Sequence, residues 1–165
     1  MFLNRTKIVH IVNGEAMLKL SKLTDYATVI LSFMAKDRLG MHAALEISKV
    51  TGITLPMVSK ILKLLVKAHV LTSVRGAKGG YLLARSPERI TVATVISALE
   101  GPIALTECNA SHKNCDQASG CEIQGNWGLI NQKVFNALDS VTLADMIMPV
   151  KSPVEIKIPV SSLYR

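Results

Sequence analysis

Apolar residues recur every three or four positions along the early part of the chain, a spacing typical of amphipathic helices. The first predicted helix begins at Leu23, with Thr24 as its expected N-cap and Asp25 as an acidic residue in its first turn. Its apolar face consists of Ala27, Ile30, Leu31, Met34 and Ala35. We therefore expect this helix to pack on the core.

Two further helices are predicted on either side of a tight turn. The first, over about 43–50, ends at Gly52, because glycine favours the backbone conformation that closes a helix. The second follows Thr54 as candidate N-cap, has Pro56 in its first turn, and carries an apolar stripe of Val58, Ile61, Leu62, Leu65 and Ala68. Two helices joined by such a glycine-containing turn form a helix-turn-helix.

A β-hairpin is predicted directly after the helix-turn-helix. Residues 70–74 and 81–84 are short strand-like runs, and the loop between them holds Arg75, Lys78 and three glycines. Glycines allow the backbone to approach another surface closely, and the two cations extend outward from it. This pattern indicates the basic wing of a winged helix-turn-helix.

A fourth helix and a long loop follow the wing. Thr91 is expected to cap the helix, and Gly101 and Pro102 to stop it. The loop over 102–125 contains all three cysteines of the chain. Loops of this length inside a compact unit are usually functional.

A long amphipathic helix is predicted from Asn126, with Trp127 as its anchor in the core. Thr142 is expected to cap a final short helix that runs through Met146. An amphipathic helix outside the DNA-binding core can pack on the fourth helix or pair with a second subunit. We expect it to do both, as a dimerisation helix.

The predicted fold class is mainly α with a small β-hairpin wing (α+β), a winged helix-turn-helix followed by a long C-terminal dimerisation helix. Residues 1–16 are expected to be either a disordered N-terminal extension or an untranslated stretch before a start at Met17. The expected segments after it are a DNA-binding domain (17–101), a cysteine loop (102–125), the dimerisation helix with the final short helix (126–148), and a flexible tail (149–165).

Positive charge is concentrated in the first half of the chain. Residues 1–90 carry a formal charge of +9, and residues 91–165 carry −2. This difference favours a polyanionic partner for the first half of the chain. Surface lysines that serve only solubility are an alternative explanation of the same difference. Lys60, Lys63 and Lys67 share one face of the third helix, opposite its apolar stripe. The candidate residues for contact with double-stranded DNA are Thr54, Met57, Ser59, Lys60, Lys63, Arg75 and Lys78.

Several classes of protein are disfavoured by what the sequence lacks. No stretch has the roughly 18 to 20 consecutive apolar residues of a membrane span, and the first residues show no export signal. We therefore expect a soluble cytoplasmic protein with reduced thiols and no membrane partner. No nucleotide-binding loop, carboxylate pair or Ser-His-Asp set is apparent, which argues against an enzyme and against a small-molecule substrate.

The three cysteines, Cys108, Cys115 and Cys121, form a candidate ligand set within one loop. Thiolates are soft ligands that suit iron-sulfur clusters, zinc and copper(I). A structural zinc site would be expected to include a Cys-x-x-Cys pair and a fourth cysteine or histidine. The pair is absent, and His112 is the only histidine in the loop. Burial of the cysteines as small apolar side chains fits poorly with the many polar residues around them.

Together these motifs resemble the Rrf-two family of bacterial regulators, which includes the IscR and NsrR regulators. The resemblance covers about 17–147. Two of its motifs, Leu-Thr-Glu-Cys at 105–108 and Gly-Asn-Trp at 125–127, resemble regulators of the Suf cluster-assembly operon. The motifs are Leu-Thr-Asp-Tyr-Ala at 23–27, Val-Arg-Gly-Ala-Lys-Gly-Gly-Tyr at 74–81, Val-Ile-Ser-Ala-Leu-Glu-Gly at 95–101, Leu-Thr-Glu-Cys at 105–108 and Gly-Asn-Trp at 125–127.

The resemblance implies a homodimeric repressor whose affinity for its DNA operator depends on an iron-sulfur cluster, with 2Fe-2S favoured over 4Fe-4S. The implied targets are the suf genes of cluster assembly. The alternatives are a nitric-oxide or redox sensor of the same family, and a zinc-stabilised interaction module without operator specificity.

The fourth cluster ligand is predicted from the same resemblance. Where IscR-like members carry a histidine after the third cysteine, this chain has Gln124. In NsrR proteins an aspartate of the other subunit completes the cluster, and the matching residue here is Asp25. Asp25 has an alternative role as a favourable charge at a helix start, and the other candidate ligands are His112, Asp116 and Glu122.

Overall fold

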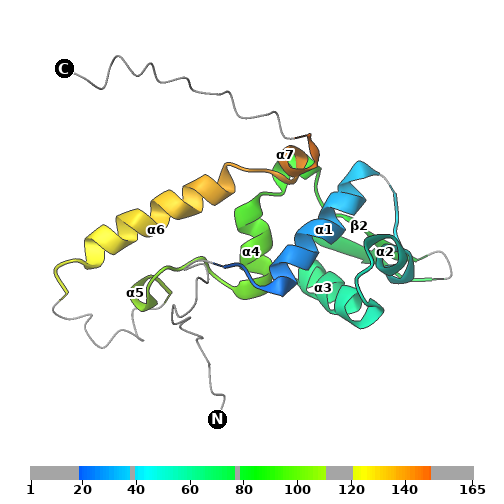
Figure 1. Cartoon of the computed structure of the whole chain (residues 1–165), viewed down its shortest axis with the longest axis horizontal. Helices are drawn as coiled ribbons and strands as arrows, with labels where there is room; N and C mark the ends of the chain where they lie inside the picture. The colour runs from blue at the N-terminus through cyan, green and yellow to red at the C-terminus, as the bar shows by residue number, and fades with distance from the viewer. Residues whose placement is uncertain (1–18, 38–39, 77–78, 111–120, 150–165) are drawn as a thin grey trace, which may run out of the picture.

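The computed structural model describes residues 19–37, 40–76, 79–110 and 121–149. Helices α1 to α4 and α7 form one body together with the two-stranded sheet, and α6 extends away from it (Figure 1). In chain order the elements are α1 (Lys22–Lys36), α2 (Ala44–Thr51), α3 (Leu55–Lys67), β1 (Leu71–Val74), β2 (Gly80–Leu83), a 3-10 turn η1 (Pro87–Arg89), α4 (Val92–Glu100), α5 (Glu107–Ala110), α6 (Gln124–Asp139) and α7 (Leu143–Ile147).

The start of α1 differs from the sequence prediction. Ser21, not Thr24, is the N-cap, and the Ser21 hydroxyl accepts a hydrogen bond from the backbone N–H of Thr24. Thr24 lies inside the first turn, and its side chain is completely buried. The prediction failed because the hydroxyl of Thr24 has a distant partner, the carboxylate of Glu100, which no local pattern reveals.

The helix-turn-helix forms as the sequence predicts. Gly52 closes α2 in the left-handed conformation, with φ of 72°, which glycine adopts without steric cost. Pro56 lies in the first turn of α3, where its missing N–H costs no hydrogen bond. The predicted stripe of α3 enters the core that α1, α2 and α4 complete, where its fully buried members are Val58, Ile61, Leu62 and Leu65.

The wing is an antiparallel hairpin of β1 and β2. It is joined to the helix-turn-helix by a β-bridge in which His42 and Tyr81 exchange two backbone hydrogen bonds, each of 2.9 Å. Gly80 lies beside this bridge, and a Cβ there would stand 2.8 Å from the carbonyl oxygen of His42. The glycine therefore allows the close approach that fixes the wing against the segment before α2.

Helices α4 and α7 are capped as predicted. The hydroxyl of Thr91 accepts from the backbone N–H of Thr94, and Thr142 forms a capping box with Asp145. The two caps lie side by side, because Thr91 and Thr142 form an isolated β-bridge. Helix α7 then packs on α1, which closes the core on that side.

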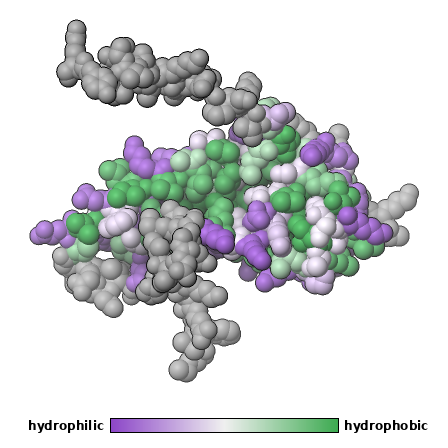
Figure 2. Space-filling model, in the orientation of Figure 1, coloured by the Kyte–Doolittle hydropathy of each residue, from purple (hydrophilic) through white to green (hydrophobic). Residues whose placement is uncertain are grey.

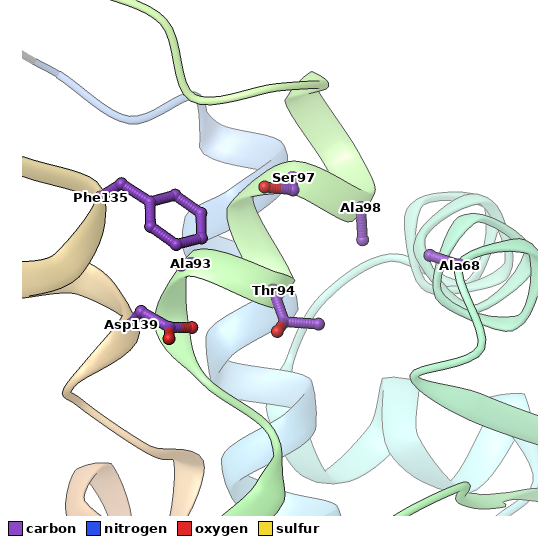
Figure 3. A pocket seen from close by; sticks show the side chains of 7 residues that line it. All are labelled: Ala68, Ala93, Thr94, Ser97, Ala98, Phe135 and Asp139. Atoms are coloured by element: carbon purple, nitrogen blue, oxygen red, sulfur yellow. The ribbon is translucent and has the colours of Figure 1, made fainter. Parts of the chain in front are cut away.

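Helix α6 stands out from the body and buries none of its residues within the chain. Phe135 points from α6 toward α4 over an open pocket of about 340 Å³, and Asp139 accepts a hydrogen bond of 2.8 Å from Thr91 (Figure 3). Trp127 was predicted to anchor the helix in the core, but this is wrong, because its side chain is 36% exposed. Helix α6 approaches α4 and Thr91 through Phe135 and Asp139 near its C-terminal end, whereas Trp127 lies near the other end.

The fold class is therefore the predicted one, mostly helical with a two-stranded hairpin. The predicted cysteine loop contains a short helix, α5, and α6 begins at Gln124 rather than Asn126. The expectations for 1–16 and for the tail beyond Pro149 concern residues outside the described ranges. Of the helices in the described part of the chain, none combines the length and the apolar character that crossing a bilayer requires.

Candidate nucleic-acid interface and cysteine site

Helix α3 presents a basic face to solvent. Lys60 and Lys63 are exposed opposite the buried stripe, and Met57 and Ser59 are half-buried at its edge. Thr54 is exposed at the N-terminus of the helix, and its hydroxyl makes no capping hydrogen bond. The first turn contains no acidic residue, so its partial positive charge and free N–H groups remain available to an anion.

The wing carries a second cationic position beside α3. Arg75 is exposed directly after β1, and Gly76 follows it with φ of 124°, a conformation that favours glycine. Gly79 also requires its small size, because a Cβ there would collide with the carbonyl oxygen of Val74. The hairpin therefore turns tightly enough to project Arg75 outward. Lys78, the other predicted cation, lies outside the described residues.

The charge around this surface has one sign. Between residues 40 and 76 the chain contains five lysines and arginines and a single acidic residue, Glu46. Glu46 is occupied elsewhere, since its carboxylate lies 3.1 Å from Nδ1 of His42 and also accepts from the backbone N–H of Ala43. The exposed cations of α3 and the wing therefore have no acidic neighbour in this segment to neutralise them, which favours a polyanion.

Cys108 is placed by hydrogen bonds that tie its segment to α6. Its side chain is buried in α5, and its Sγ lies 3.1 Å from the hydroxyl of Thr106. The side-chain amide of Asn109 donates to the backbone carbonyl of Trp127 in α6. Asn131 holds the preceding segment, accepting from the N–H of Leu105 at 3.0 Å and donating to the carbonyl of Ile103 at 3.1 Å.

The remaining cysteines are only partly described. Cys121 is half-buried just before α6, and its carbonyl accepts from the N–H of Gln124. Cys115 lies outside the described residues, and so do the alternative ligands His112 and Asp116. Within the described ranges no three histidine, cysteine or acidic residues gather closely enough to hold a metal ion. Of the three predicted ligands, Cys108 thus lies in α5 and Cys121 just before α6, and these two helices contact each other.

Asp25 and Glu122 are both exposed. Asp25 lies in the first turn of α1, where its backbone carbonyl accepts a hydrogen bond from the hydroxyl of Thr28. Its carboxylate has no hydrogen bond or ion pair within the described part of the chain. An exposed carboxylate at this place is compatible with either predicted role, a charge at a helix start or a ligand supplied to another subunit.

Sequence reasoning missed the polar side chains that organise this region, namely Glu100, Thr106, Asn109 and Asn131. Glu100, Asn109 and Asn131 each form a hydrogen bond with a residue of a distant segment, and Thr106 forms one with Cys108 two residues later. The only local signal was the polar character of Asn131 within an otherwise amphipathic helix. A long-range hydrogen bond leaves no periodic trace in a sequence.

Comparison with known proteins connects this geometry to a family. The model of the Rrf2 (Rrf-two) family, described as iron-dependent transcriptional regulator, matches residues 20–149. The chain belongs to the Rrf2 family. The match spans every helix and strand from α1 to α7.

Relatives of known name are regulators of transcription. Protein rrf2 of Nitratidesulfovibrio vulgaris (strain Hildenborough) is 31% identical over 131 residues, which cover 79% of this chain and 87% of that protein. The HTH-type transcriptional regulator IscR of Xenorhabdus nematophila is 30% identical over 131 residues and 79% of each chain. The chain is therefore a transcriptional regulator of the Rrf2 family, and its relatives are not enzymes, as the sequence predicted.

Solved structures of Rrf2-family regulators share the fold. CymR (YrzC), described as the global cysteine regulator of B. subtilis, superposes with a TM-score of 0.62 at 30% identity, over 79% of this chain and 97% of that one. T. potens IscR gives a TM-score of 0.57 at 30% identity, over 79% and 86% of the two chains. The winged helix-turn-helix of the Rrf2 regulators is thus the fold of this chain as well.

Proposed function

We propose that this Rrf2 regulator is a homodimeric, cytoplasmic repressor that holds an iron-sulfur cluster on Cys108, Cys115 and Cys121 and controls the suf genes of cluster assembly. The observation that carries the proposal is the position of Cys108 in α5 and of Cys121 just before α6, two helices that contact each other. The description of the family as iron-dependent and the likeness to IscR support it.

The residues present suit a cluster chemically. Thiolates are its usual protein ligands, and the hydroxyl of Thr106 lies within hydrogen-bond distance of the sulfur of Cys108. A bound cluster would supply a group whose presence changes with iron, redox state or nitric oxide. Asp25 would supply the fourth ligand from the partner subunit, since Gln124 is a neutral amide and a poorer donor than a carboxylate.

The dimer would form through α6. Figure 2 shows hydrophobic side chains gathered along this helix, and Leu129 and Ile130 are 61% and 44% exposed. Trp127 adds to the same exposed set. A helix with an apolar face and no buried residue in its own chain is stabilised when a second copy covers that face.

DNA would be bound by α3 and the wing together. Helix α3 would enter the major groove with Thr54, Met57, Ser59, Lys60 and Lys63 toward bases and phosphates. Arg75 and Lys78 would reach the flanking minor groove, whose narrow form attracts cationic side chains. The packing of β1 on α3 supports this arrangement, and the bridge between His42 and Tyr81 fixes the same wing to the segment before α2.

The test is to purify the protein anaerobically and compare its cluster-loaded and cluster-free forms. We expect a coloured dimer whose visible absorbance is lost in the Cys108→Ala, Cys115→Ala and Cys121→Ala variants, and whose loaded form binds a suf operator more tightly. A colourless protein with stoichiometric zinc would overturn the proposal in favour of a zinc-stabilised module. Equal operator affinity of the two forms would remove the cluster from control of DNA binding.

Asp25 is tested separately by the Asp25→Ala and Asp25→Asn variants. We expect both to change the visible spectrum and to shorten the lifetime of the cluster under anaerobic conditions, because each removes the anionic oxygen. An unchanged spectrum and lifetime in both variants would leave Asp25 only its role at the start of α1.

A further inference from the structure

The carboxylate of Glu100 joins the end of α4 to the start of α1. Its Oε1 accepts a hydrogen bond of 3.1 Å from the backbone N–H of Ser21 and a second one from the hydroxyl of Thr24. Thr24 is completely buried, so its hydroxyl has no access to water as an alternative partner. Loss of the Glu100 carboxylate would leave a buried donor unpaired, which is costly.

The electrostatics of this contact favour the ionised carboxylate. Burial raises the pKa of Glu100, but the hydrogen bonds from Thr24 and Ser21 outweigh burial and hold that pKa below its ordinary value. The charge is therefore present at neutral pH. It lies at the N-terminus of α1, where a helix stabilises an anion through its dipole.

Glu100 also lies between the two segments that carry the proposed ligands. On one side, Thr24 directly precedes Asp25. On the other side, Gly101 ends α4 with φ of 92°, and the chain continues through the segment that Asn131 clamps to reach Cys108. A displacement of that segment would thus reach the start of α1 through one carboxylate.

We propose that Glu100 is a positioning residue that transmits the state of the cysteine site to α1. Helix α1 packs on α2 and α3, so its orientation bears directly on the helix-turn-helix. Glu100 acts through Thr24 and Ser21 and does not itself bind the cluster or DNA. The inference rests on the proposed function, because it requires a cluster whose loading changes operator affinity.

A matched control exists in the same chain. The carboxylate of Asp145 in α7 also accepts from a backbone N–H and a threonine hydroxyl, both of Thr142, at 2.8 and 2.6 Å. It caps a helix in the same chemical way, but both partners lie within one short stretch of the chain, and neither belongs to the segment between α4 and Cys108 or to the first turn of α1. Asp145→Ala therefore measures the effect of losing a cap alone.

The experiment measures operator affinity of the loaded and cluster-free forms for the wild-type protein and for Glu100→Ala, Glu100→Gln, Thr24→Val and Asp145→Ala. Allosteric coupling in proteins commonly corresponds to an affinity ratio of about 5 to 150. We expect Glu100→Ala and Thr24→Val to bring this ratio close to one while the absorbance of the cluster remains. Glu100→Gln keeps an oxygen that accepts both bonds, so we expect it to preserve most of the ratio.

A second measurement does not depend on DNA. Amide hydrogen exchange of residues 21–25 reports opening of the first turn of α1. We expect exchange there to slow on cluster loading in the wild-type protein, and to be fast and independent of loading in Glu100→Ala. Melting temperatures identify any variant that fails to fold, and Thr24→Val then provides the milder perturbation.

The outcomes separate this inference from the proposed function. A wild-type ratio of one would overturn both, since there would be no signal to transmit. A wild-type ratio well above one that survives in Glu100→Ala and Thr24→Val would overturn only the role of Glu100. An equal loss of the ratio in Asp145→Ala would also overturn it, because any weakened cap would then have the same effect.

Discussion

Replacement of Lys63 by alanine should change the salt dependence of operator binding by a predictable amount. Lys63 is exposed on α3, opposite the residues that enter the core, so its loss leaves the fold intact. Each phosphate neutralised by a protein cation contributes about −0.9 to the slope of log affinity against log salt concentration. A homodimer presents Lys63 twice, so the slope of Lys63→Ala should be less steep by about 1.8.

The expected effect is large enough to measure by fluorescence anisotropy. Between 50 and 200 mM salt, a slope difference of about 1.8 means that the affinity advantage of the wild-type protein falls roughly 12-fold. Lys133→Ala is the matched control, because Lys133 is exposed on α6, away from α3 and the wing. An unchanged slope in Lys63→Ala would refute its contact with phosphate, and a change of about 0.9 would refute its symmetric use by two subunits.

Four further predictions test separate parts of the structure. Gly79→Ala should weaken operator binding in the same assay without loss of visible absorbance, because the added Cβ meets the carbonyl of Val74 and shifts the wing. Ile130→Glu should give a folded monomer in sedimentation velocity, since it places a charge on the exposed apolar face of α6. Leu65→Ala should lower the free energy of unfolding in urea by about 2 to 5 kcal/mol, because the side chain is fully buried. Because the pKa of Glu100 is held below its ordinary value of 4.5, its ionised form stabilises the fold fully above about pH 4.5. The difference in the free energy of unfolding in urea between wild type and Glu100→Gln should therefore vanish as the pH falls through the folded-state pKa. A difference that grew with acidification would contradict that direction.

The sequence predicted those parts of the fold whose cause is local. The apolar stripe of α3, the glycine that ends α2 and the threonines that cap α4 and α7 all act within one or two turns of the chain. The hairpin was also visible, because its strands are neighbours in sequence and its loop needs glycine. Local chemistry of this kind is readable without the structure.

The errors have a common physical origin in contacts between distant residues. Thr24 has the side chain of a good N-cap, but its hydroxyl is used by Glu100, 76 positions later. Trp127 has the size of a core residue, but it lies on a part of α6 that the body of its own chain does not cover. The spacing of apolar residues along a sequence shows neither which distant residue a side chain will bond nor which part of a helix the rest of the chain will bury.

The candidate site was predictable to a different extent in its two parts. The basic residues of α3 and the wing follow from helical spacing and from the glycine-rich loop, and the structure leaves Lys60, Lys63 and Arg75 exposed. The cysteines were recognisable by type, but the hydrogen bonds of Asn109 and Asn131 that hold their segment against α6 were not. Their role as ligands remains a prediction, and the spectra of the cysteine variants will test it.

The backbone bridge between His42 and Tyr81 has a consequence for the DNA sequences that this regulator can use. Because both partners of the bridge are main-chain groups, replacing the side chain of His42 or Tyr81 does not remove it, and the wing stays fixed to the segment before α2. Helix α3 packs on both α2 and β1, so the wing and α3 keep a constant relative position. The distance between the groove that α3 enters and the groove that Arg75 reaches is then constant within each half-site. We expect insertion of one base pair inside a half-site, which lengthens it by about 3.4 Å, to abolish recognition. Variation among natural operators should therefore be confined to the spacer between half-sites, where the relative placement of the two subunits can adjust.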